Sequence, residues 1–199
     1  YKELIQKYND GDLSFAAVST VNLDEYRGLT HDNDQSYYYF MNDNLFNHIN
    51  IDKANTFVPN GKSTDIDAEC KAYDQRIADL GGIDIQLLGI GTNGHIGFNE
   101  PGTSFDQETF IIELTEKTRE DNKRFFASID EVPTHAITMG IKNIMQAKSI
   151  VMLISGASKK ETVEKLLKGP ITESFPASIL HNHQDVTVII DEDAYQNMK

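Results

Sequence analysis

Residues 83–102 read IDIQLLGIGTNGHIGFNEPG, and this stretch decides the fold. Its first eight residues form an apolar run rich in isoleucine and leucine, which predicts a buried β-strand over 83–90. A polar loop with four glycines follows directly. In open α/β sheets, ligands bind just beyond the carboxyl ends of the strands. We therefore expect an α/β protein with a functional site on this loop.

The rest of the chain alternates strand-length apolar runs with helix-length amphipathic segments. We predict further strands at 15–23, 149–155 and 185–190, weaker ones at 111–114 and 136–139, and helices at 36–49, 65–80, 116–126, 141–147 and 158–167. This alternation predicts a Rossmann-like, open and mostly parallel sheet with helices on both faces. Because no repeat or linker divides the sequence, we expect a single domain over residues 1–199.

Composition narrows the classes of partner. The 199 residues carry 18 Lys plus Arg against 31 Asp plus Glu, a formal charge of -13, which argues against a nucleic-acid partner. A mean hydropathy of -0.42 and the lack of a long apolar run argue against a membrane protein. The single cysteine, Cys70, can form no internal disulfide, and no signal-like segment opens the sequence. A cytoplasmic location is expected.

Gly89, Gly91 and Gly94 match the spacing G-x-G-x-x-G of dinucleotide-binding loops. That reading requires a helix directly after the glycines, but Gly97, Pro101 and Gly102 interrupt the segment. The glycines fit better a loop that turns sharply and lets its backbone approach a ligand closely.

Within this loop, His95 and Glu100 are spaced so that a tight turn can bring imidazole and carboxylate together. The carboxylate would then orient the ring and support its protonated form, which makes the two residues a candidate acid/base pair. Asn93 lies two residues before His95 and offers an amide that donates or accepts hydrogen bonds but takes no proton.

Other candidates follow the remaining strands. One of the adjacent acids Asp24 and Glu25 can act as a base if burial keeps its pKa near neutrality. The turn S-G-A-S-K at 155–159 opens a helix, where N–H groups and Lys159 could hold a phosphate. Arg124 is a second candidate cation. A metal site at His181 and His183 has little support, because no third ligand shows diagnostic spacing.

Four segments in the same order resemble the glucosamine-6-phosphate deaminase family: N-L-D-E-Y-R-G-L at 22–29, S-Y-Y-Y-F-M at 36–41, D-I-D-A-E-C at 65–70 and G-I-G-T-N-G-H-I-G-F-N-E-P at 89–101. The similarity extends across essentially all 199 residues. It implies a Rossmann-like sheet and conversion of glucosamine 6-phosphate and water to fructose 6-phosphate and ammonia. It also implies that neither a metal nor an organic cofactor takes part.

The resemblance also implies roles for individual residues. Asp24 matches the base that moves a proton from C2 to C1 of the open-chain sugar. Asn93, His95 and Glu100 match the group that opens the pyranose ring, although many members have Asp at the position of Asn93. Arg124 and Lys159 match phosphate-binding positions. Their charge and this match together lead us to expect an anionic sugar as substrate.

Two expectations concern the limits of the match. In the family, a first strand, a first helix and a phosphate loop precede the position of Tyr1, so we expect an N-terminal strand and helix to be missing here. We expect a monomer or a small homo-oligomer. The alternatives to a deaminase are a hydrolase resembling 6-phosphogluconolactonase, which shares the fold and a similar loop, and a non-catalytic protein that binds sugar phosphates.

Overall fold

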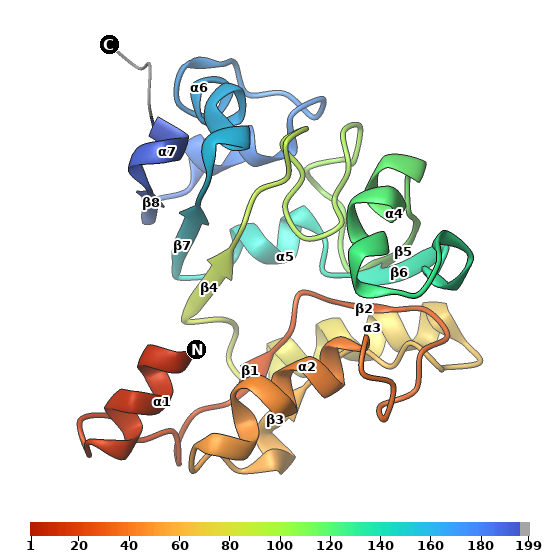
Figure 1. Ribbon diagram of the computed structural model, residues 1–199, viewed down its shortest axis with the longest axis vertical. Coiled ribbons are helices and arrows are strands. Elements are labelled where there is room, and N and C mark those ends of the chain that lie inside the picture. Colours follow the sequence, from red (N-terminus) through yellow and green to blue (C-terminus); the bar gives the residue numbers. More distant parts are fainter. Residues whose placement is uncertain (196–199) are drawn as a thin grey trace. The chain divides into compact units, whose positions relative to one another are not determined.

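The computed structural model describes residues 1–195 of the chain. They form two compact units, each built from two stretches of sequence. The first unit combines Tyr1–Ala72 with Ile111–Ile137, and the second combines Tyr73–Phe110 with the rest of the chain from Thr138. Figure 1 labels the α-helices and strands of both units. The single domain over 1–199 stays a prediction.

The first unit contains two small sheets. One sheet pairs β1 (Thr20–Val21) in parallel with β3 (Thr56–Phe57). The other has the strand order β2 (Asp24–Tyr26), β6 (His135–Thr138), β5 (Phe110–Glu113). The helices are α1 (Lys2–Asn9), α2 (Tyr37–Asn44) and α4 (Glu116–Asn122), with the 3-10 helices η1 (Phe46–His48), η2 (Lys53–Asn55), η3 (Lys123–Phe125) and η4 (Ile129–Glu131).

The predicted strand over 15–23 is wrong for most of its length. Only Thr20–Val21 is a strand, and residues 15–18 form a turn in which the Val18 N–H donates to the Phe15 carbonyl at 3.0 Å. Phe15 and Val18 pack against a cluster formed by Met41, Leu45, Phe46 and Ile51. The apolar run therefore reflects a packed turn, because burial alone does not distinguish a strand from a turn.

Most other elements lie close to their predicted positions. The two weak strands are confirmed as β5 and β6. The helix predicted over 36–49 ends at Asn44, because Leu45 leaves the helical region with φ -143°. The helix predicted over 158–167 begins as the 3-10 helix η5 (Ala157–Lys159) and continues as α6 (Lys160–Lys168).

The second unit is built around a parallel three-stranded sheet. Strand β7 (Ser149–Ile154) lies between β4 (Ile85–Leu88) and β8 (Val186–Ile190), and Leu88 pairs with Met152 (Figure 1). Helix α3 (Ile66–Asp79) enters this unit from the first. The other helices of the unit are α5 (Ile141–Met145), η5, α6, η6 (Pro176–Asn182) and α7 (Glu192–Tyr195).

The two faces of this sheet differ in exposure. On one face, Leu88, Ile150 and Met152 are almost fully buried. On the other, apolar side chains stay exposed, with Ile85 at 68% and Ile189 at 54%. Helices covering both faces were expected, and the described residues leave this second face open. The class is confirmed as α/β with parallel strand pairing, to which isolated antiparallel bridges are added.

None of the helices within residues 1–195 combines the length and the apolar character that crossing a bilayer requires.

Candidate active site

The glycines of the loop after β4 make room for side chains. A Cβ on Gly91 would lie 2.2 Å from the His95 ring, so the imidazole lies directly against the Gly91 backbone. The loop closes on itself, since the Gly91 N–H donates to the His95 carbonyl and the Gly94 N–H to the Gly91 carbonyl, both at 2.9 Å. Gly94 has φ +88°, a conformation that favours glycine. No helix follows these glycines before β5, so the loop lacks the helix that a dinucleotide-binding motif requires.

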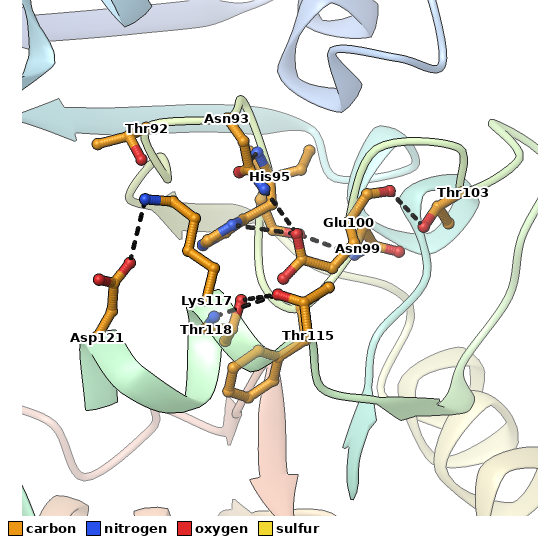
Figure 2. Close-up of polar contacts among 12 residues, drawn as sticks. Thr92, Asn93, His95, Asn99, Glu100, Thr103, Thr115, Lys117, Thr118 and Asp121 are labelled. Atoms are coloured by element: carbon orange, nitrogen blue, oxygen red, sulfur yellow. Dashed lines mark hydrogen bonds and ion pairs between the residues drawn. The ribbon is translucent and has the colours of Figure 1, made fainter. Parts of the chain in front are cut away.

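The loop brings Asn93, His95 and Glu100 together, as predicted (Figure 2). The Asn93 amide donates to Glu100 Oε2 at 2.7 Å, and the same oxygen lies 3.7 Å from His95 Nδ1. The second distance is that of an ion pair and is too long for a hydrogen bond. His95 Nδ1 is buried and has no hydrogen-bond partner among the described residues. A shift of less than 1 Å would therefore give Nδ1 a carboxylate partner.

Neighbouring polar contacts hold the second half of the loop. Asn99 is completely buried, and its amide donates to the carbonyls of Ile96 and Met139 at 2.8 and 2.9 Å. The Glu100 carbonyl accepts from both the backbone N–H and the hydroxyl of Thr103 (Figure 2). Because its backbone is fixed on both sides, the Glu100 carboxylate, only 8% exposed, is held in place.

The first unit separates the roles of Asp24 and Glu25. Glu25 is 2% exposed, and its carboxylate accepts hydrogen bonds from the backbone N–H groups of Tyr26, Tyr37 and Tyr38 at 2.8 to 3.0 Å. It therefore caps the N-terminus of α2, together with Ser36, whose hydroxyl accepts from the Tyr39 N–H. This capping role assigns Glu25 to structure and leaves Asp24 as the candidate base.

Asp24 has the electrostatics of a base that works near neutral pH. Burial and, secondly, the charge of Glu25 raise the pKa of the Asp24 carboxyl to about 7. Tyr26, on the same strand, receives a hydrogen bond from the Asn122 amide at 3.0 Å, and burial raises the pKa of its phenol to about 12. The phenol therefore stays neutral, whereas Asp24 exchanges protons in the physiological range.

The two predicted phosphate-binding cations have different surroundings. Arg124, on η3 of the first unit, is exposed, and its guanidinium lies 4.7 Å from the Phe125 ring centroid. Lys159, on η5 of the second unit, is half-buried, and its ammonium donates to the carbonyl of Ile90 at 2.6 Å. This contact places the Lys159 charge at the start of the Gly-rich loop.

The turn before Lys159 differs from the expected anion cradle. The carboxylate of Asp191 accepts hydrogen bonds from the Gly156 N–H at 3.0 Å and from the Ser155 hydroxyl at 2.6 Å. The hydrogen bond from Ser155 and, secondly, one from the Ala194 N–H keep the pKa of the Asp191 carboxyl below its usual range. The Gly156 N–H, one of the groups that the sequence offered to phosphate, is thus engaged within the chain, and Lys159 remains the charged candidate of this segment.

The described residues contain no cluster of three or more His, Cys, Asp or Glu placed to hold a metal ion. His181 and His183, the weak metal candidates, lie at the end of η6. Their Nε2 atoms contact the carbonyls of Leu166 and Ala147 respectively, which makes both of them structural residues.

Sequence reasoning missed three contributors to the site. It left Glu25 undecided, because Glu25 caps a helix that begins twelve residues later and therefore shows no local capping pattern. It also missed Asp191, and the contact of Phe175 with the Gly94 backbone. Both contacts join segments far apart in sequence, so no spacing could have revealed them.

An α/β fold with a histidine beside a buried carboxylate at the end of a parallel strand is typical of enzymes that use acid/base catalysis. The sequence comparison is more specific. Residues 1–189 match the model of the family Glucosamine-6-phosphate isomerases/6-phosphogluconolactonase, and the chain belongs to this family.

Two curated relatives are named as deaminases. The chain is 58% identical over 199 residues to "Glucosamine-6-phosphate deaminase" of Clostridium perfringens (strain 13 / Type A), covering 100% of the chain and 82% of the relative. It is 55% identical over 194 residues to "Glucosamine-6-phosphate deaminase 1" of Bacillus subtilis (strain 168), covering 98% and 80%.

Among solved structures, too, a deaminase is more similar to this chain than a lactonase is. A structure described as a monomeric glucosamine-6-phosphate deaminase superimposes with a TM-score of 0.96 at 55% identity, covering 98% of this chain and 80% of the other. The 6-phosphogluconolactonase of Trypanosoma brucei superimposes with a TM-score of 0.72 at 21% identity, covering 100% and 79%. The second likeness concerns the fold alone.

Proposed function

We propose that this chain catalyses the conversion of glucosamine 6-phosphate and water to fructose 6-phosphate and ammonia. One observation carries the proposal: identity of 54–58% to proteins named as glucosamine-6-phosphate deaminases, extending over the whole chain in several of them. The 6-phosphogluconolactonase of Trypanosoma brucei, by contrast, is only 21% identical.

The loop after β4 supplies the groups for ring opening in this proposal. His95 exchanges a proton with the ring oxygen or the anomeric hydroxyl of the pyranose, which yields the open-chain aldehyde. Glu100, 3.7 Å from Nδ1, stabilises the imidazolium form of the ring. Asn93 holds the Glu100 carboxylate through the hydrogen bond of 2.7 Å and remains uncharged throughout.

Asp24 then performs the isomerisation. Its carboxylate takes the C2 proton, forming an enediol-type intermediate that carries the amine on C2, and returns the proton to C1. Water adds to the resulting C2 imine, and the C–N bond breaks with release of ammonia. A carboxyl group with a pKa of about 7 suits this step, because it accepts and returns a proton with little energetic preference for either state.

Arg124 and Lys159 anchor the phosphate in this proposal. In a protein with a net charge of -13, an anionic substrate requires local cations, and these two residues match the family's phosphate-binding positions. Exposed Arg124 and half-buried Lys159 offer a charge-assisted bond each. No metal or organic cofactor enters any of these steps.

We further propose a monomeric, cytoplasmic enzyme. The proposal of a monomer rests on the likeness to the deaminase structure described as monomeric, at a TM-score of 0.96. The cytoplasmic location rests on the single buried cysteine, Cys70, which is typical of proteins from reducing compartments. Light scattering coupled to size-exclusion chromatography tests the monomer directly.

The function is tested by assaying two substrates side by side in the presence of EDTA. We expect ammonia and fructose 6-phosphate from glucosamine 6-phosphate, and no acid release from 6-phosphogluconolactone above its spontaneous hydrolysis. Acid release without ammonia would replace the deaminase with a lactonase. Binding of glucosamine 6-phosphate without turnover would favour a non-catalytic binding protein.

A further inference from the structure

The turn between Asn93 and His95 is supported from outside the loop by the start of η6. A Cβ placed on Gly94 would lie 2.3 Å from the Phe175 ring, so the ring packs directly against the Gly94 backbone. The Ala177 N–H donates to the Gly94 carbonyl at 2.9 Å. One segment therefore contacts Gly94 through both a ring and a hydrogen bond.

This segment, residues 172–178, is itself tightly held. The Ser178 hydroxyl is completely buried and bonds both the N–H and the carbonyl of Thr172, at 2.8 and 3.0 Å. The Phe175 N–H donates to the same carbonyl, and Pro176 restricts the backbone that follows. Phe175 is 9% exposed. The ring that contacts Gly94 is therefore fixed before any substrate arrives.

The same segment also contacts the far end of the loop. The Gly102 N–H donates to the Glu173 carbonyl at 2.8 Å, and the Phe105 N–H donates to the Glu173 carboxylate at 3.0 Å. Gly102 lies two residues beyond Glu100. Residues 172–178 thus contact the loop just before His95 and just after Glu100.

We propose that Phe175 is a positioning residue that sets the orientation of the His95 ring through Gly94, an inference that rests on the proposed function for its kinetic consequence. His95 packs against Gly91, whose carbonyl accepts from the Gly94 N–H, so Gly94 lies between the His95 turn and the Phe175 ring. Removing the ring opens a void beside Gly94 and lets the turn relax. His95 Nδ1 then loses its place 3.7 Å from Glu100.

The test compares Phe175→Ala and Phe175→Leu with the control Leu180→Ala. Leu180 lies on η6, the 3-10 helix that begins just after Phe175, and is similarly buried, so its truncation lowers stability in a comparable way. For Phe175→Ala we expect kcat to fall roughly 10- to 100-fold, because misplacing a catalytic group by about 1 Å has effects of this size. We expect KM to change less than about threefold, since Phe175 is not one of the predicted phosphate-binding residues. The Leu variant should lie between Ala and the parent, and Leu180→Ala should keep kcat within about threefold.

A second readout does not depend on turnover. The Cε1–H resonance of His95, assigned with His95→Gln, reports the surroundings of the ring by NMR. It should shift or broaden in both Phe175 variants and remain unchanged in Leu180→Ala. If the parent shows no deaminase activity, this comparison still decides the positioning role.

An unchanged His95 resonance in Phe175→Leu, or an equal loss of kcat in Leu180→Ala, would overturn the proposal. If Phe175→Ala does not fold, the Leu variant, which keeps an apolar side chain in the core, gives the decisive comparison.

Discussion

At the scale of single residues, the two acids after Val21 show how neighbouring carboxylates acquire different roles. Glu25 is engaged by three backbone N–H groups, whereas burial and the Glu25 charge raise the pKa of Asp24 to about 7. If Asp24 is the base, deamination should rise with pH through this value, because only the ionised carboxylate can take the C2 proton.

Glu25→Gln tests the link between the two acids. It removes a buried charge and weakens the cap of α2, so stability should fall by about 1 to 3 kcal/mol, and the acidic limb of the kcat profile should move to lower pH. Ser36→Ala is the matched control, because it removes another cap of the same helix, at about 1 kcal/mol, without a change of charge. If the acidic limb of the kcat profile moves equally in both variants, the charge of Glu25 does not raise the pKa of Asp24. Activity measured over pH 5–9 and urea unfolding provide the data.

Gly91 offers a second test at the residue scale. Gly91→Ala places a Cβ 2.2 Å from the His95 ring, which must move, so we expect kcat to fall by at least about a hundredfold. Gly89→Ala is the control in the same loop, since its Cβ would meet nothing within 4 Å. Ammonia release by both purified variants measures the difference. Full activity of Gly91→Ala would show that the orientation of His95 is unimportant.

The sequence predicted which residues of the loop come together but not how they pair. Spacing indicated a His95–Glu100 contact, yet Asn93 makes the short bond to Glu100, and the imidazole lies 3.7 Å away. The glycines indicated a sharp loop, but they accommodate the His95 and Phe175 rings, and the partner at Gly94 comes from the residue just before η6. Packing between distant segments is not encoded in local spacing.

At the scale of elements, it was easier to predict whether a segment is a helix or a strand than where it begins and ends. Strands β7 and β8 and helices α3 and α6 lie within two residues of their predicted bounds, whereas β4 covers only Ile85–Leu88 of the predicted 83–90. Failure occurred where an apolar run packs as a turn, at Phe15 and Val18, and where α2 stops at Leu45. The first exception depends on tertiary packing and the second on the backbone angle of Leu45. The secondary-structure propensity of the residues determines neither.

The two cations on η3 and η5 give a prediction at this scale. Arg124→Ala and Lys159→Met should each raise KM for glucosamine 6-phosphate about tenfold or more, with a smaller effect on kcat, because a charge-assisted bond to the phosphate is lost. Lys123→Ala is the control for Arg124, since it removes the same charge from the neighbouring residue of η3. Initial rates over a range of substrate concentrations separate the two constants. If Lys123→Ala raises KM as much as Arg124→Ala, the effect reflects general charge and not a specific anchor.

At the scale of the whole molecule, composition argued against some classes of binding partner but could not indicate which apolar residues are exposed. A charge of -13 predicted no attraction to nucleic acid, and the alternating pattern predicted the α/β class. No pattern in the sequence indicated that one face of the β4–β7–β8 sheet is exposed, because apolar residues such as Ile85 and Ile189 resemble core residues in a linear pattern.

The pH dependence of global stability tests Asp24 independently of catalysis. The pKa of Asp24 is about 7 in the folded protein and about 3.9 in an unfolded chain, so folding favours the protonated form. Its stabilising contribution is complete below the unfolded value and is lost as pH rises through about 7. A difference of about three pKa units corresponds to about 4 kcal/mol.

Asp24→Asn should therefore melt about 8 to 16 °C above the parent at pH 8, and the gain should vanish near pH 4. Asp43→Asn, at an exposed position of α2, is the control and should show no such trend. Thermal unfolding followed by circular dichroism measures both. A constant difference between Asp24→Asn and the parent at both pH values would place Asp24 in ordinary solvent.

The central claim is that this chain is a deaminase in which Asp24 moves the proton from C2 to C1. The most direct measurement is the production of ammonia and fructose 6-phosphate from glucosamine 6-phosphate, with EDTA present, by the parent and by Asp24→Asn. We predict turnover by the parent, a loss of about 10²- to 10⁴-fold in the variant, and retained binding of the substrate by both. Equal turnover by Asp24→Asn and the parent would contradict the assignment of the base, and lactone hydrolysis without ammonia would contradict the assignment of the reaction.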